Sequence, residues 1–198
     1  MYVIRFCALA LVLISNLASA QPQQVPSTSP AKARIEVPTI AADAKDVASI
    51  DAIVRAFYEV ISGPAGQPRQ WARDRSLYRP EIRFNIVRFD REGRPSLHTQ
   101  THQEFVESSN DALVKRGFFE REIHRVTRRF GNIAQVFSTY EARVKENGPV
   151  IERGINSIQL VRDGTRWWIT SASWQDETKD HPIPPEYLPT AAKEPHNE

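Results

Sequence analysis

The chain has 198 residues, of which 40% are hydrophobic and 25% are charged. This composition provides for one ordinary folded domain and excludes a wholly disordered chain. The formal net charge of +2 is small and scattered along the sequence, so it does not indicate a partner nucleic acid.

The N-terminus has the pattern of a secretory signal peptide. Met1–Arg5 is a weakly basic start, an apolar stretch follows over residues 6–17, and Ala18-Ser19-Ala20 fits a small-residue cleavage site. The apolar stretch is shorter than the ~20 residues that a membrane-spanning helix needs. We expect residues 1–20 to be removed and the mature protein to be exported, periplasmic or secreted, with no membrane attachment. Cys7 is the only cysteine, so the mature chain would have no disulfide and no thiolate metal ligand.

Proline-rich stretches flank the middle of the chain. Residues 21–41 and 181–198 have no periodic apolar face, which is typical of flexible segments. We therefore expect a disordered linker over 21–41, a single domain over 42–180 and a flexible tail over 181–198.

Three helices are predicted in the first part of this domain. Apolar residues recur every three or four positions from residue 47 to residue 61, with Asp43 or Asp46 as the cap and Gly63-Pro64 as the end. A short helix is expected over 69–75. Thr101-His102-Gln103-Glu104 is a capping box that begins a third helix, which ends before Gly117.

Strands are predicted both before and after the third helix. Residues 82–87 and 96–100 form a first pair, and four long antiparallel runs follow over 118–130, 133–145, 155–161 and 167–174. Asp163-Gly164 indicates the last hairpin turn. Helices beside a largely antiparallel sheet indicate an α+β fold. In the final strand, simple alternation places Trp168 and Trp174 on the face opposite Trp167, where they are candidates for a dimer interface.

The element order over 42–175 resembles the nuclear transport factor two-like superfamily, in its SnoaL-like (polyketide cyclase-like) branch. The resemblance also rests on Phe130-Gly131-Asn132-Ile133-Ala134 in the central hairpin and on the stretch from Asp163 to Ile169 in the final one. It implies a cone-shaped sheet, curved around the helices, with a hydrophobic cavity at its open end and often a homodimer. Some members are isomerases, dehydratases, cyclases or hydrolases that need no cofactor. No motif here matches one branch's catalytic set, so no catalytic residue is taken from the family.

His124 and Glu122 are the catalytic candidates. A two-residue turn at Gly131-Asn132 sets His124 opposite Thr139, whereas a three-residue loop sets it opposite Ser138, beside Tyr140. The second register gives the more consistent apolar face and is preferred. His124 would then face the cavity as an acid or base, with Glu122 on the same face. The alternative for His124 is a structural histidine without a chemical role. The alternative for Glu122 is a carboxylate paired with an arginine at the rim of the sheet.

The segment after the first helix is expected to close the cavity. Trp71, Tyr78, Phe84 and Tyr140 are the candidate pocket residues, and ordinary core packing is the alternative for the first three. No metal site is expected, because the capping box separates His98 from the helix that carries His102. The sequence thus predicts an exported protein that binds a small apolar molecule or serves as an accessory domain. The alternative is a cofactor-independent isomerase, dehydratase or hydrolase with His124 as the acid or base.

Overall fold

The computed structural model describes residues 34–190. The predicted signal peptide, most of the predicted linker and the last eight residues lie outside this range. The helices are α1 (Ala44–Val47), α2 (Ile50–Glu59), α3 (Trp71–Arg75), α4 (His102–Arg116) and the short 3-10 helix η1 (Pro185–Tyr187). The strands are β1 (Phe84–Phe89), β2 (Pro95–Gln100), β3 (Phe119–Phe130), β4 (Ile133–Arg143), β5 (Val150–Arg162) and β6 (Trp167–Asp176). No helix within 34–190 is long and apolar enough to span a membrane.

The predicted α+β fold and element order are confirmed, with two differences. The first expected helix is divided, because the Ser49 side chain caps a new helix by accepting a hydrogen bond from the Ala52 N–H. The six strands form one sheet in the order β2-β1-β6-β5-β4-β3. The pair β1 and β6 is parallel, so the sheet is mixed. The expectation of an antiparallel sheet is wrong at this pair, because α4 reverses the chain between the first hairpin and the long strands.

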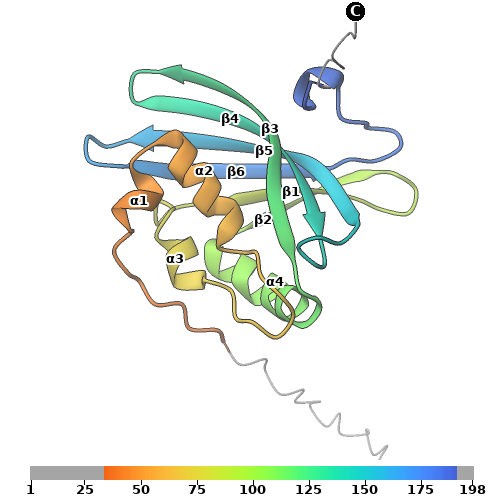
Figure 1. Ribbon diagram of the computed structural model, residues 1–198, viewed down its shortest axis with the longest axis horizontal. Helices are drawn as coiled ribbons and strands as arrows, with labels where there is room; N and C mark the ends of the chain where they lie inside the picture. Colours follow the sequence, from red (N-terminus) through yellow and green to blue (C-terminus); the bar gives the residue numbers. More distant parts are fainter. Residues whose placement is uncertain (1–33, 191–198) are drawn as a thin grey trace, which may run out of the picture. The chain divides into compact units, whose positions relative to one another are not determined.

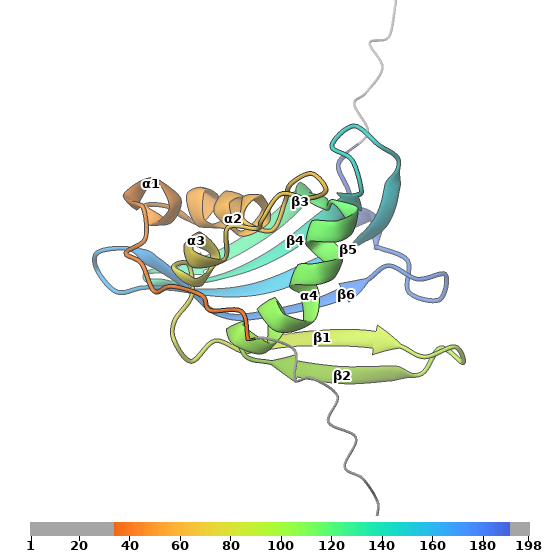
Figure 2. The same cartoon turned by 90° about the horizontal axis from the view of Figure 1, so that it is seen from below.

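The helices α1 to α4 lie on one face of the curved sheet (Figures 1 and 2). The main core fills the space between this inner face and α2 and includes Ile53, Val54, Val60, Leu77, Val136, Ile158, Leu160 and Ile169. A smaller cluster around Trp71 and Val106 lies between α3 and α4. Burial of these side chains is the main stabilising contribution.

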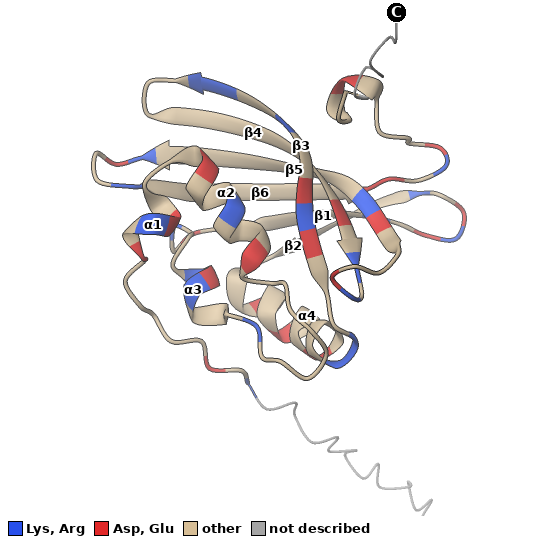
Figure 3. Cartoon of the chain, in the orientation of Figure 1, with Lys and Arg blue, Asp and Glu red and all other residues tan. Residues whose placement is uncertain are grey.

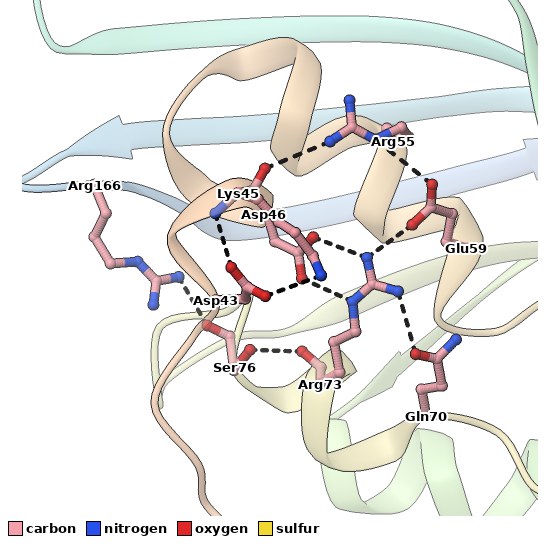
Figure 4. A network of polar contacts seen from close by, with 9 residues as sticks. All are labelled: Asp43, Lys45, Asp46, Arg55, Glu59, Gln70, Arg73, Ser76 and Arg166. Carbon is pink, nitrogen blue, oxygen red and sulfur yellow. Dashed lines mark hydrogen bonds and ion pairs between the residues drawn. The ribbon is translucent and has the colours of Figure 1, made fainter.

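An ion-pair network holds α3 against α1 and α2 (Figure 4). The Arg73 guanidinium donates from Nε and Nη2 to the two carboxylate oxygens of the buried Asp46, at 2.7 and 2.8 Å. It also contacts Glu59 at 2.7 Å. The hydrogen bonds from Arg73 lower the pKa of Asp46, although burial opposes them. This bidentate geometry fixes the segment that leads to the cavity.

Two β-bulges decide which side chains face the helices. The first lies between Glu122 and His124 in β3, and the second adds Thr170 to β6 between the pairs Gln159–Ser171 and Leu160–Ile169. An extra residue reverses the alternation beyond it. The faces predicted from plain alternation are therefore wrong on one side of each bulge.

The packed unit extends past the expected bounds at both ends. At the N-terminal end, Val37 is buried and its carbonyl accepts a hydrogen bond from Arg75. At the C-terminal end, Ile183 is buried and the Tyr187 ring packs on Phe137, on the outer face of the sheet. Residues 34–41 are thus not a free linker, and residues 181–190 are not a free tail, because proline-rich segments can pack without regular secondary structure.

Candidate functional site

A cavity of about 590 Å³ lies between the inner face of the sheet and the helices. Its apolar walls come from α2, α4, β1 and β6 and include Phe57, Ile61, Phe84, Phe89, Phe105 and Trp174. Its polar side chains are Arg88, Ser109, Glu120, Tyr140, Glu152, Asn156, Asp176 and Thr178. The volume is in the range of small-molecule sites.

Aromatic rings in mutual contact form one wall of this cavity. Phe84 packs on Tyr78, Phe105 and Trp174 with ring centroids 5.1 to 5.9 Å apart. Phe105 and Trp174 also meet edge to face at 5.8 Å. Because the rings support one another, this wall is preformed for an apolar ligand.

Three carboxyl groups line the same cavity, from three strands. Glu120 lies on β3, Glu152 on β5 and Asp176 on β6. They belong to the inner face because Glu120 is paired with Ala142, and Asp176 with Gly154. Within residues 34–190, no ion pair joins any of the three to an arginine or lysine.

Glu120 is the most enclosed of the three. It keeps a little exposed surface, and Asn156 Nδ2 donates to its Oε1 at 3.3 Å. Burial raises its pKa to about 8; the Asn156 hydrogen bond opposes this, and the negative charges of Glu152 and Asp176 add to it. Glu120 therefore holds a proton at neutral pH but can release it in a moderately basic range.

Glu152 and Asp176 are neighbouring carboxyl groups in the cavity lining. Burial raises the pKa of Glu152 to about 7, and the negative charge of Asp176 acts in the same direction. The Tyr140 hydroxyl donates to Asp176 Oδ1. The cavity thus has two acidic centres in which burial raises the pKa of a glutamate, Glu120 or Glu152, and raised carboxyl pKa values are typical of acid–base sites.

A second cavity of about 510 Å³ borders Glu120 between α2 and β3. Its lining is charged and includes Asp51, Arg55, Glu122, Arg125 and Arg143, and we call it the polar groove. Acidic and basic residues alternate along this part of β3 (Figure 3). Glu120 therefore lies in the wall between an apolar cavity and a polar one.

The structure brings only some of the predicted pocket residues together. Tyr78, Phe84 and Tyr140 line the apolar cavity, and ligand binding by them stays a prediction. Trp71 does not line it; its indole packs on Phe105 and donates from Nε1 to Asn110 at 2.8 Å. Trp71 is therefore a core-packing residue, which was the alternative to a place in the pocket.

His124 does not face the cavity. The hairpin has the two-residue turn, with Phe130 paired to Ile133 and His124 to Thr139, so the preferred register is wrong. Thr139 faces outward, where its hydroxyl donates to the Tyr187 carbonyl at 2.6 Å, and directly paired residues share a face. His124 therefore lies on the outer face, away from the carboxyl groups.

Glu122 lies on the inner face, but in the polar groove. The bulge separates it from His124, so the expected shared face is wrong. It accepts a hydrogen bond from Ser138 and pairs with Arg125 at 3.2 Å, so the alternative of a carboxylate paired with an arginine applies to it. Burial raises its pKa, and the Ser138 hydrogen bond and the Arg125 charge oppose the rise.

The two candidate interface tryptophans lie on opposite faces. Trp174 lines the cavity, because the bulge at Thr170 turns it inward, so its assignment to the interface is wrong. Trp168 stays on the outer face, where the Arg166 guanidinium covers its ring at 3.5 Å. Its role in an interface stays a prediction.

His98 and His102 lie in different environments. His98 is exposed on β2, whereas His102 is buried and its Nε2 is 2.9 Å from Asp74 Oδ2. Asp74 also accepts a hydrogen bond from the Tyr78 hydroxyl at 2.7 Å. Within residues 34–190, no group of three or more His, Cys, Asp or Glu side chains could hold a metal ion.

Sequence reasoning missed Glu120, Glu152, Asn156 and Asp176. The pattern that could have found them is on β5, where Glu152, Gly154 and Asn156 occupy the same face as the buried Ile158 and Leu160. Polar residues in register with a core face indicate a polar site within that face.

No family model and no curated protein matches the sequence. Among solved structures, a Nostoc punctiforme protein of unknown function with a cystatin-like fold matches with a TM-score of 0.51 and 8% identity, over 71% of this chain and 97% of that one. A nuclear transport factor two-like protein of unknown function from Silicibacter pomeroyi has a TM-score of 0.44 and 16% identity, over 66% and 94%. A hexachlorocyclohexane dehydrochlorinase, LinA type 2, has a TM-score of 0.45 and 10% identity, over 70% and 93%. At these identities the likenesses concern the fold alone, and the first of them indicates a cystatin-like fold for this chain.

Proposed function

We propose that this protein binds a small, mostly apolar molecule in the cavity and transfers protons on it. Glu120 would be one acid–base group, and the Glu152–Asp176 pair the other. The observation that carries the proposal is the meeting of three carboxyl groups at the wall of an aromatic cavity, where none of them forms an ion pair with an arginine or lysine of residues 34–190. The reaction class is isomerisation, in which a proton is moved from one atom of the substrate to another, or dehydration. In a dehydration one acidic centre takes a proton from carbon while the other protonates the hydroxyl, whose C–O bond breaks so that it leaves as water.

The two acidic centres suit such a reaction because both have a pKa raised toward the neutral range. A group whose pKa lies near the working pH both gives and accepts protons readily. The pKa of Glu152 is about 7 and that of Glu120 about 8, so one centre would accept a proton while the other donates one. The apolar wall would orient the substrate and exclude water, which strengthens the electrostatic interactions.

A ligand-binding role without catalysis is the second candidate. It is favoured by the preformed aromatic wall of Phe84, Phe105 and Trp174, which needs no carboxyl to hold an apolar molecule. The two functions share the cavity and differ in what Glu120 does.

The test begins with native mass spectrometry of protein purified gently from its own source, which identifies a retained molecule by mass. That molecule and its close analogues are then incubated with wild-type protein, Glu120→Gln and His124→Ala. We expect Glu120→Gln to lose turnover and keep binding, and His124→Ala to keep both. Binding without turnover by the wild type would favour the second candidate, and turnover lost only in His124→Ala would reject the assignment of Glu120.

We also infer export, on the pattern of residues 1–20. N-terminal sequencing of the protein from its own cells should begin at Gln21. A chain that keeps residues 1–20 would contradict cleavage.

A further inference from the structure

A chain of hydrogen bonds leaves Glu120 and crosses beneath α2 to the polar groove. Asn156 Nδ2 donates to Glu120 Oε1 at 3.3 Å and to the Tyr58 hydroxyl at 3.1 Å. The Tyr58 hydroxyl is 2.6 Å from Ser138 Oγ, and Ser138 donates to Glu122 Oε2. Three side chains, Asn156, Tyr58 and Ser138, thus connect the Glu120 carboxyl in the cavity wall with the Glu122 carboxyl in the groove.

The Glu122 carboxylate, at the groove end of the chain, fixes which group donates in each hydrogen bond. Because Ser138 gives its hydrogen to Glu122, it accepts the hydrogen of Tyr58. The Tyr58 oxygen then accepts from Asn156, which places the amide NH₂, and not the amide oxygen, beside Glu120. The orientation of the Asn156 amide is therefore set by the chain behind it.

The chain is enclosed and anchored. Tyr58, Ser138 and Asn156 are all at most 4% exposed. At the groove, Arg125 holds Glu122 at 3.2 Å and is itself held by Asp51 of α2 at 2.8 Å. A buried chain of this kind is rigid because each member would lose its partner on rotating.

The geometry points to Asn156 as the positioning residue of Glu120, and to Tyr58 and Ser138 as the groups that fix the Asn156 amide. An NH₂ donor stabilises the ionised form of a buried carboxyl. Without it, the Glu120 carboxyl would keep its proton to a still higher pH, because the Asn156 hydrogen bond opposes the rise that burial causes in its pKa. The catalytic consequence rests on the proposed function, whereas the positioning itself does not.

Other ionisable groups also face Glu120. Glu152 on β5, Asp176 on β6 and Tyr140 on β4 stay in place in every variant. The hydroxyls of Tyr58 and Tyr78 also interact with the Glu120 charge, so Tyr58→Phe is compared with Tyr78→Phe, which differs in having no contact with Asn156.

The experiment is a titration of the Glu120 carboxyl by ¹³C NMR in protein labelled at glutamate, with the signal assigned by its loss in Glu120→Gln. Asn156→Ala should raise the midpoint by about one pH unit, a tenfold change in the acid constant. Tyr58→Phe should move it in the same direction by less. Tyr78→Phe is the matched control, because it removes a buried hydroxyl at the same cavity that donates to Asp74 instead.

An unchanged midpoint in folded Asn156→Ala would overturn the proposal. Equal shifts in Tyr58→Phe and Tyr78→Phe would reject the part assigned to Tyr58. Tyr58→Phe removes a single oxygen, so it keeps the test valid if Asn156→Ala does not fold. The titration uses no ligand, so its failure is separate from a failure to find turnover, which would reject the proposed reaction alone.

Discussion

The Tyr140 hydroxyl reaches across a strand to donate a hydrogen bond to Asp176. Tyr140 on β4 and Asp176 on β6 are both paired with Gly154 on the strand between them. A Cβ atom on Gly154 would lie 2.4 Å from the Tyr140 hydroxyl and 2.4 Å from the Gln175 carbonyl oxygen. The absence of a side chain at this one position lets the tyrosine cross, so the carboxyl end of the cavity depends on it.

Gly154→Ala should therefore destabilise the protein. The new methyl group has a backbone oxygen on one side and the Tyr140 ring on the other, and overpacking of this kind costs about 1–3 kcal/mol. The free energy of unfolding from urea titration measures the effect. Gly148→Ala in the β4–β5 turn is the control, with a nearest contact of 3.1 Å, and should lose much less. Equal losses in both variants would contradict the crowding at Gly154.

Much of the fold could be predicted because its elements have strong local patterns. The capping box at Thr101 is present, with the Glu104 N–H donating to the Thr101 hydroxyl at 3.2 Å and the Thr101 N–H donating to Glu104 at 2.7 Å. The turn at Gly131, with φ of 55°, joins the two strands that were expected there. Both features depend on residues that are close in sequence.

The site could be predicted only in part, because two single-residue bulges decide it. Each bulge leaves the hydrophobic pattern of its strand almost unchanged but turns the residues beyond it to the other face. Trp174 thereby enters the cavity, and Glu122 turns to the inner face, away from His124. Glu120 was overlooked beside Glu122 because its environment comes from Asn156 and Glu152, more than thirty residues along the chain.

The raised pKa values of Glu120 and Glu152 predict a loss of stability in base. Their ordinary pKa is 4.5, and the folded values are about 8 and about 7. Between these limits the folded protein holds protons that the unfolded chain has released, so the free energy of unfolding falls as the pH rises from about 4.5 to about 8. The slope from Glu120 is at most about 1.4 kcal/mol per pH unit, and the exposed Glu152 contributes much less because solvent screens its charge. Carboxyls with a lowered pKa, such as Asp46, act below this window.

Glu120→Gln should remove one of these contributions. We expect a shallower fall above pH 6 and a variant more stable than wild type at pH 8, measured by urea unfolding at a series of pH values. Glu81→Gln, at an exposed side chain, is the control and should follow the wild type. A Glu120→Gln curve parallel to the wild type would contradict the protonation assigned to Glu120.

Asp74→Ala should destabilise the protein by disrupting the contact between α3 and α4. The Asp74 carboxyl is fully buried and accepts hydrogen bonds from Tyr78 and pairs with His102. Removing it leaves two buried polar groups without a partner, at about 1–3 kcal/mol each. Asp180→Ala, at an exposed position, is the control for thermal and urea unfolding. Wild-type stability in Asp74→Ala would show that water replaces the carboxyl without cost.

The outer face of the sheet carries an exposed apolar row that predicts self-association. The row crosses three neighbouring strands: Phe130 on β3 is paired with Ile133 on β4, which is paired with Val161 on β5. These side chains are 84%, 56% and 38% exposed. Trp168 continues the row on β6. Exposed apolar rows of this kind are typical of protein interfaces.

We therefore expect a homodimer through this row, which Ile133→Asp should convert to monomers by placing a charge at its centre. The measurement is mass by light scattering after size-exclusion chromatography, at several concentrations. Val150→Asp is the control, because it is 41% exposed but lies at the other end of β5. A wild-type monomer at all concentrations, or a dimer that persists in Ile133→Asp, would reject this interface. Neither outcome bears on the cavity, which lies on the inner face and is tested by its own variants.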